Sequence, residues 1–258
     1  MGRAIAVCNQ KGGVGKSTTA VNVGAYMAVS GAKTLLIDLD PQGNATTACG
    51  IKRAEITHDA YDVLVEKTPL SDAVINTSID RLDLIPSSID LAGAESHLVN
   101  VEEKETCLKT ACEPAKERYD VILFDCPPSL GLLTINALVA AESTLIPVQC
   151  EYLALEGVSA LLKSIALIKQ RLNPELRVGG IVLTMTDGRT NLSREVSEEL
   201  KRFFKDRVFE TAIPRNIRLA ESPSFGKPIC LYDPHSAGAL AYDLLTKEVM
   251  IKEGILCR

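Results

Sequence analysis

The stretch Asn9–Thr18, which reads NQKGGVGKST, decides the fold. It follows a short apolar run at 4–9 that has the character of a buried strand, and a helical pattern begins at about Ser17. Gly15, Lys16 and Ser17 supply the end of the phosphate-loop pattern G-x-x-x-x-G-K-[ST]. A strand, a glycine-rich loop and a helix in this order predict a loop whose backbone N–H groups surround a phosphate at the positive end of the helix.

The loop departs from that pattern at its opening position, where Gln10 replaces the first glycine and a second lysine, Lys11, follows. Lys16 is expected to neutralise the β- and γ-phosphates, and the Ser17 hydroxyl is expected to ligate Mg²⁺. From the residues alone, Lys11 is either a solvated loop charge or a group that meets a second anion. The predicted phosphate-binding residues are Lys11, Gly12, Gly13, Val14, Gly15, Lys16, Ser17 and Thr18.

The rest of the chain alternates short aliphatic runs with longer helical patterns, which is typical of a parallel sheet covered on both faces. We therefore predict an α/β fold with a doubly wound, mostly parallel sheet and helices on both faces, as one P-loop ATPase domain over 1–258. The predicted strands are 4–9, 34–40, 82–86, 121–125, 143–149, 179–184 and 208–214, and the predicted helices are 17–30, 88–114, 132–142, 153–172, 192–206 and 236–250.

Composition limits the possible partners. The chain of 258 residues is 46% hydrophobic and carries a net charge of −5, so nucleic acid or an anionic membrane would have to meet a local basic patch. Its eight cysteines form no C-x-x-C pair and are expected to be reduced structural thiols. No signal peptide is recognisable, and no apolar run approaches the roughly 20 residues that cross a bilayer. We expect a cytoplasmic protein.

Aspartates end two of the predicted strands. Asp125 closes the run VILFD, as expected of a second magnesium-binding motif, and Asp38 and Asp40 end the run LLIDLD. Side chains alternate along a strand, so Asp38 and Asp40 are expected on one face at the rim, beside the phosphates. One could orient an attacking water while the other supports the metal. Asp40 could instead simply initiate a turn before Pro41.

Several motifs together resemble one family. KGGVGKST, DLDPQGN, FDCPPSLG, VQCEYLALEG and IPRNIRLAESPSFGKPI resemble the ParA/Soj-type partition ATPases, within the deviant Walker A (ParA/MinD) superfamily. The resemblance runs from about residue 3 to 250. It implies that Lys11 reaches across a face-to-face homodimer to the phosphates held by the partner. ATP would then hold two subunits together, and slow hydrolysis would release them.

The resemblance also implies roles at single positions. Asp40 looks like the water-positioning residue, and Asp38 and Asp125 would lie near Mg²⁺. Pro214 and Asn216 resemble the segment that contacts adenine. Met185 could pack on the base or could be an ordinary core methionine.

A basic segment is the candidate for DNA contact. Between residues 189 and 218 lie eight basic and five acidic side chains, in a chain that is acidic overall. Such a patch, doubled by dimerisation, could bind the phosphates of double-stranded DNA without reading sequence. Arg189 and Arg218 are the leading candidates. The family resemblance implies a nucleoid-associated protein whose hydrolysis is stimulated by a ParB/Spo0J-type centromere-binding partner. The alternative from composition alone is a solvated helix face.

Other functions of the superfamily remain as alternatives. A MinD-type membrane-associated ATPase needs a C-terminal amphipathic helix, whereas the tail here, KEVMIKEGILCR, is short and of mixed charge. An electron-transfer ATPase that shares an iron–sulfur cluster would need a cysteine set that the spacing does not provide, although Cys126 adjoins Asp125. The cargo could also be a protein assembly in place of a chromosome or plasmid.

Overall fold

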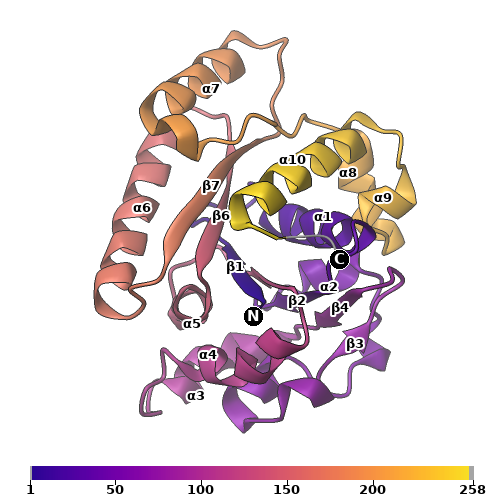
Figure 1. Ribbon diagram of the computed structural model, residues 1–258, viewed down its shortest axis with the longest axis vertical. Helices are drawn as coiled ribbons and strands as arrows, with labels where there is room; N and C mark the ends of the chain where they lie inside the picture. The colour runs from indigo at the N-terminus through magenta and orange to yellow at the C-terminus, as the bar shows by residue number, and fades with distance from the viewer. Residues whose placement is uncertain (1, 256–258) are drawn as a thin grey trace.

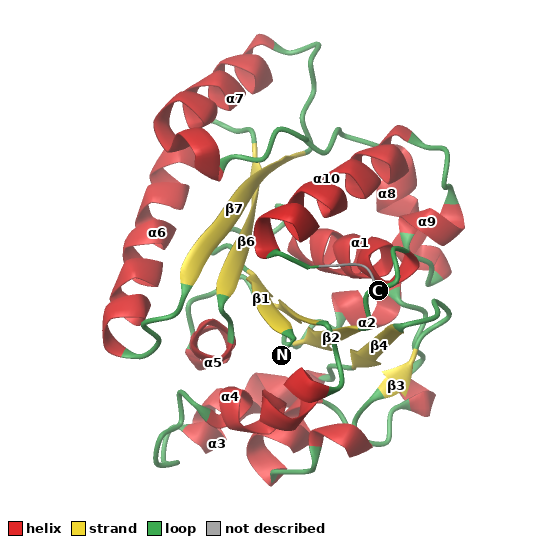
Figure 2. Cartoon of the chain, in the orientation of Figure 1, coloured by secondary structure: helices red, strands yellow, loops and turns green. Residues whose placement is uncertain are grey.

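The computed structural model describes residues 2–255 and contains a seven-stranded sheet in the order β3-β4-β2-β5-β1-β6-β7. All neighbouring strands run parallel except the short β3, which pairs antiparallel with β4 at one edge. Figures 1 and 2 show the twisted sheet between two layers of helices. The strands are β1 (Arg3–Val7), β2 (Thr34–Asp38), β3 (Ile75–Asn76), β4 (Leu82–Ile85), β5 (Val121–Asp125), β6 (Ser143–Gln149) and β7 (Arg177–Thr184).

Side-chain alternation along the strands divides the core between the two faces. On β1, Ile5 and Val7 pack with α1 and α10, while Ala4 and Ala6 pack with α5 and α6. Both faces are therefore apolar, which explains the uninterrupted hydrophobic runs in the sequence. The helices are α1 (Lys16–Val29), α2 (Asn44–Ala48), α3 (Ala94–Leu98), α4 (Cys107–Cys112), α5 (Leu132–Ala140), α6 (Ala154–Arg171), α7 (Asn191–Phe204), α8 (Ile217–Glu221), α9 (Ile229–Tyr232) and α10 (Ala237–Glu253).

The strand register brings the site residues to one edge of the sheet. Asp125 on β5 is paired with Val7 on β1 and with Asp38 on β2, so three central strands end at the same level. The loop after Val7 and the segment after Asp38 consequently meet beside Asp125. In parallel sheets of this kind, ligands bind beyond the carboxyl ends of the strands.

The predicted fold class is confirmed, with corrections to two segments. The predicted strand 208–214 follows the edge of β7 but is joined to it only through isolated bridges, Ile181 to Val208 and Thr186 to Pro214. The ladder is interrupted because the N–H groups of Glu210 and Thr211 donate to the Glu248 side chain instead of to β7. The predicted helix 88–114 is broken into α3, α4 and short 3₁₀ turns. Glu103, between these pieces, has a φ of 55°, which no continuous right-handed helix accommodates.

Two predictions from composition, reduced cysteines and no membrane-spanning helix, can be compared with the structure. The described cysteines are free thiols, and burial raises the pKa of Cys8 to about 12, as expected of inert core thiols. Cys257 lies outside the described residues. Over residues 2–255, no helix is long and apolar enough to cross a membrane, and no group of three or more His, Cys, Asp or Glu side chains is arranged to hold a metal ion.

Candidate functional site: a phosphate-binding loop above two buried aspartates

The loop 9–15 is held in shape by contacts at its base and apex. Asn9 donates its side-chain amide to the Pro147 carbonyl (2.7 Å) and accepts the Lys11 N–H (3.1 Å). The Thr184 hydroxyl donates to the Val14 carbonyl (2.9 Å), so the end of β7 fixes the apex. The loop is therefore preorganised by β6 and β7, the two strands on one side of β1.

Two glycines of the loop adopt conformations that disfavour other residues. Gly13 has a φ of 74° and Gly15, the N-cap of α1, has a φ of 87°. Both lie in the left-handed region, where a Cβ is strained. These turns leave the N–H groups of the first helical turn without intrahelical partners, and such groups are suited to bind an anion.

A cleft of about 390 Å³ opens above this loop. One side of the cleft is formed by the loop residues Gly12, Gly13, Gly15, Lys16, Ser17 and Thr18, and another side is formed by Asp40. Val14 is buried and does not border the cleft. No binding role was predicted for most of the remaining lining, although several of its residues lie within the motifs DLDPQGN and IPRNIRLAESPSFGKPI, and Pro128 follows Asp125 in FDCPPSLG. These further lining residues are Val21, Asn22, Gln42, Asn44, Thr47, Ala48, Pro128, Ser222, Pro223, Lys227 and Pro228.

Lys16 lies inside the cleft and Lys11 lies outside it. Lys16 is 6% exposed and donates to the Lys11 carbonyl (3.3 Å). Burial lowers its pKa, while Asp125 and Asp40 oppose that shift. The Lys11 side chain is 53% exposed and forms an ion pair with Glu151, beyond the end of β6. The two lysines of the loop therefore face different surroundings.

Asp125 is a buried carboxylate without a normal hydrogen-bond partner. Neither carboxylate oxygen has a hydrogen-bond partner among the described residues, and the residue is inaccessible to solvent. Burial, followed by the repulsion of Asp38, raises its pKa well above the usual value, and the nearby Ser17 hydroxyl lowers it only in part. An orphaned carboxylate beneath a serine hydroxyl is the donor set expected for Mg²⁺, so these residues fit that ion.

Asp38 is placed differently from the prediction, which put it at the rim beside Asp40. It is fully buried below the cleft, whereas Asp40 borders the cleft. Asp38 accepts the Thr46 N–H (2.8 Å), the Thr46 hydroxyl (2.7 Å) and the Asp40 N–H (3.1 Å). Burial raises the pKa of Asp38 to about 6 despite these hydrogen bonds. Its observed contacts hold the β2–α2 segment, and thereby the backbone of Asp40.

Thr46 is a structural partner that no sequence motif identified. Its hydroxyl also accepts the Ser87 N–H (3.0 Å) from the segment after β4. A chain of hydrogen bonds thus connects β4, α2 and β2 beneath Asp40. Only the fold brings Ser87 and Asp38 together, so a single sequence could not reveal this connection.

The predicted adenine contacts are only partly supported by position. Met185 borders the cleft and has a φ of 51°, a strained value for a methionine. Pro214 is bridged to Thr186, next to Met185. In the described structure neither Pro214 nor Asn216 borders the cleft, and the Asn216 side chain accepts the Leu219 N–H (3.2 Å) as the cap of α8.

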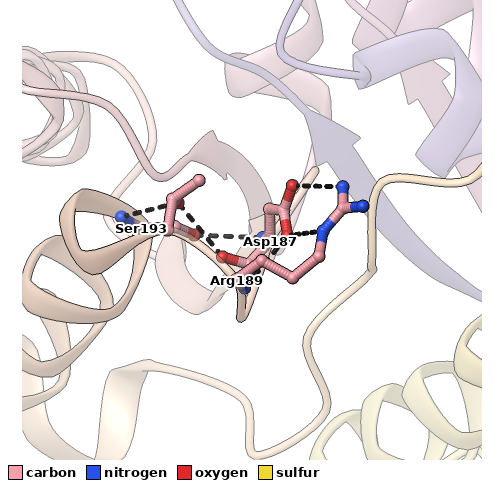
Figure 3. A network of polar contacts seen from close by, with 4 residues as sticks. Asp187, Arg189 and Ser193 are labelled. Atoms are coloured by element: carbon pink, nitrogen blue, oxygen red, sulfur yellow. Dashed lines mark hydrogen bonds and ion pairs between the residues drawn. The ribbon is translucent and has the colours of Figure 1, made fainter.

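The two candidate DNA-binding arginines are exposed and paired. Arg189 forms two hydrogen bonds with the Asp187 carboxylate (2.7 and 2.8 Å), as Figure 3 shows. These bonds lower the pKa of Asp187 to about 2. Arg218 pairs with Glu221 (2.9 Å) and Asp233 (3.3 Å). Both guanidinium groups lie at the surface, with part of their charge neutralised.

Comparison with known proteins identifies the family. Residues 2–178 match a family described as an AAA domain. The chain is 55% identical over 249 residues to the sporulation initiation inhibitor protein Soj of Bacillus subtilis (strain 168), covering 96% of this chain and 98% of that protein. It is 51% identical to the chromosome partitioning protein ParA of Myxococcus xanthus, covering 98% of this chain and 89% of that protein.

The chain belongs to the Soj/ParA family. The predicted resemblance is therefore confirmed. The fold also matches the crystal structure of cobyrinic acid a,c-diamide synthase from Mycobacterium smegmatis with bound ADP and magnesium, at 37% identity and a TM-score of 0.84 over 96% of this chain and 93% of that chain. That relative holds a nucleotide and magnesium in the same fold. The higher identities to Soj and ParA place this chain nearer the partitioning proteins.

Proposed function

We propose that this protein is a partitioning ATPase that works as an ATP-dependent dimerisation switch. With ATP and Mg²⁺ bound, two subunits associate and bind double-stranded DNA without sequence preference, and hydrolysis returns them to monomers. The cycle drives segregation of a chromosome or plasmid. The observation that carries this proposal is the separation of the two loop lysines, with Lys16 inside the cleft and Lys11 outside it.

Lys11 has its best use against an anion that approaches from outside. Lys16 already lies inside the cleft, and the Lys11 side chain pairs with Glu151 at the exposed surface outside the cleft. A facing subunit would present its own nucleotide to this exposed surface. A lysine and a phosphate about 4 Å apart attract each other by roughly 4 kcal/mol at an effective dielectric constant near 20, before desolvation costs. Glu151 would give up Lys11 when the dimer forms.

The buried carboxylates supply the hydrolytic part of the proposal. Ser17 and Asp125 would hold Mg²⁺, which neutralises charge on the β- and γ-phosphates. Asp40 borders the cleft and would position the attacking water, while Asp38 would support it through the Asp40 N–H. The phosphates would lie against Lys11 to Thr18. Pro214 and Asn216 would contact adenine from the segment next to Met185.

The surface arginines supply the proposed DNA contacts. Arg189 and Arg218 are exposed, and dimerisation would double their number on one assembly. Phosphate contacts of this kind give salt-sensitive binding without base specificity. Each arginine would exchange a carboxylate partner for a phosphate. A ParB/Spo0J-type protein on the cargo would stimulate hydrolysis, and the working location would be the nucleoid.

Binding of the Asp40→Ala protein to duplex DNA of arbitrary sequence tests the proposal. It should bind with ATP, fail to bind with ADP or without nucleotide, and weaken sharply as salt rises. Adding Arg189→Ala or Arg218→Ala should weaken binding while leaving the ATP-dependent dimer intact. Lys109→Ala is a matched control, because this exposed lysine lies on α4, far along the chain from either arginine. Nucleotide-independent binding would refute the switch.

A further inference from the structure

A second concave surface lies between α6 and the edge strand β7, away from the phosphate loop. β7 is the last strand of the sheet, and in Figure 1 α6 lies along its outer side, with α7 beyond the upper end of α6. The groove has a volume of about 840 Å³. Its far wall is the 3₁₀ turn η6 (Lys205–Arg207), which follows α7. We call it the α6–β7 groove. None of its lining residues borders the nucleotide cleft.

The floor of the groove is apolar. It is lined by Leu162, Ala166, Val178, Phe203 and Phe204. The Phe203 side chain is 62% exposed and packs edge-on against Phe204, with ring centroids 4.9 Å apart. An exposed aromatic ring beside a groove is a common anchor at protein interfaces. The floor therefore offers contacts to bulky apolar side chains.

The rim of the groove is strongly basic. Besides Arg177, five cations border the groove or its extension toward the end of α6, namely Lys163, Lys169, Lys205, Arg207 and Lys252. Asp206 is the acidic residue that lines it. Arg177, at the same end, is matched by Glu253. In a chain of net charge −5, this is a local surplus of positive charge.

The rim cations keep their charge available. Lys169 and Lys252 donate to backbone carbonyls, of Leu176 and Asp206 respectively, so their charge meets no carboxylate in those bonds. Lys163, Lys205 and Arg207 take part in no ion pair among the described residues. Lys205 also has a φ of 48°, which is a strained conformation for a lysine.

We propose that the α6–β7 groove binds an acidic segment of a partner protein that also carries bulky apolar side chains. Its leucine or phenylalanine side chains would pack on the floor beside Phe203, and its carboxylates would pair with the rim. Charge complementarity selects acidic over basic segments. The apolar floor distinguishes this surface from a pure phosphate-binding patch, because the sugar–phosphate backbone of DNA carries no bulky apolar side chain to fill it.

A short fluorescein-labelled peptide, in which leucine and phenylalanine alternate with pairs of glutamates, is the probe. Its binding to the full chain is measured by fluorescence polarisation. We expect saturable binding that weakens at least about tenfold in Lys205→Glu/Arg207→Glu and in Lys163→Glu, which alters the opposite wall. Lys109→Glu and Lys52→Glu are matched charge reversals outside the groove and should leave binding unchanged. ATPase activity and thermal unfolding confirm that every variant is folded.

The peptide itself provides the second test. Replacing its leucines and phenylalanines with serine should abolish binding, because the glutamates alone make no apolar contacts with the floor of the groove. Equal binding of the serine peptide, or no loss in the groove variants, would overturn the proposal. Displacement of the probe by duplex DNA, together with loss of DNA binding in the groove variants, would show that the groove is a DNA surface instead.

Discussion

Asp125→Asn is expected to stabilise the nucleotide-free protein while removing its response to magnesium. Asp125 is fully buried, and neither oxygen has a hydrogen-bond partner of normal geometry among the described residues. The folded chain therefore disfavours the ionised form of Asp125, and its pKa is raised for that reason. The unfolded chain has no such cost. An amide of nearly the same size removes the charge without creating a cavity.

The magnitude follows from protonation linkage. A carboxyl group of ordinary pKa 3.8 that stayed protonated in the folded protein at pH 7 would forgo about 4 kcal/mol of folding free energy, which is the upper limit for this site. A protonated carboxyl and an amide are both neutral and without partners at this position, so their burial cost is similar and largely cancels. Ser17 and Lys16 relieve part of the cost of ionising Asp125, so we expect a net gain of about 1–3 kcal/mol at pH 7, below that limit.

The pH dependence has a definite sign. A group whose folded pKa is raised favours folding at pH values below its unfolded pKa, and that advantage is lost as the pH rises through the folded pKa. The difference in unfolding free energy between the variant and the parent should therefore be larger at pH 7 than at acidic pH. It should shrink toward zero as the pH falls to about 4.

Urea unfolding at several pH values, with and without Mg·ADP, measures both effects. The parent should gain stability from Mg·ADP, and Asp125→Asn should lose the part of that gain that requires magnesium. Asp80→Asn is the control, because that side chain is 99% exposed and its removal should change stability by less than about 0.5 kcal/mol. A less stable Asp125→Asn protein at pH 7, or one with an unchanged magnesium response, would refute the reasoning.

Three further predictions concern other parts of the molecule. Lys16→Ala should abolish nucleotide binding in calorimetric titration, since it removes the cation buried in the cleft; binding at parental affinity would contradict this. Thr46→Val should lower the rate of hydrolysis several-fold with little change in the KM for ATP, because Asp38 would lose a charged hydrogen bond, and Thr46→Ser should restore the rate. Gly180→Val should lower the free energy of urea unfolding by about 1–3 kcal/mol, because a Cβ would overlap the Phe209 ring. Gly157→Ala in α6 is the control, because its Cβ would meet no neighbour, and it should raise that free energy by about 0.5–1 kcal/mol.

Much of the fold could be predicted because its signals are local. The strands 121–125 and 143–149 were predicted at their observed bounds, since each is an aliphatic run that is buried on both faces. The first helix begins within one residue of its predicted start, because the glycine loop ends there. The predicted strand 208–214 is interrupted because the N–H groups of Glu210 and Thr211 donate to Glu248 on α10, so only its two ends pair with β7.

The site was less predictable because its geometry depends on contacts between distant segments. The phosphate loop is a continuous motif, so its residues could be found directly. Asp38 is held below the cleft by hydrogen bonds from Thr46, and the partner of Lys11 is Glu151, which follows the end of β6. The roles assigned to Pro214 and Asn216 rest on the family resemblance and stay predictions.

The most direct test of the central claim is the association state of the Asp40→Ala protein, measured by sedimentation with ATP, with ADP and without nucleotide. We expect a dimer with ATP alone. Adding Lys11→Ala should return the protein to a monomer although ATP still binds, because Lys16 and the loop glycines remain. Adding Glu151→Gln instead should strengthen the dimer, since it frees Lys11 from its ion pair. A dimer that forms with ADP, or that persists with ATP after Lys11→Ala, would contradict the proposed switch.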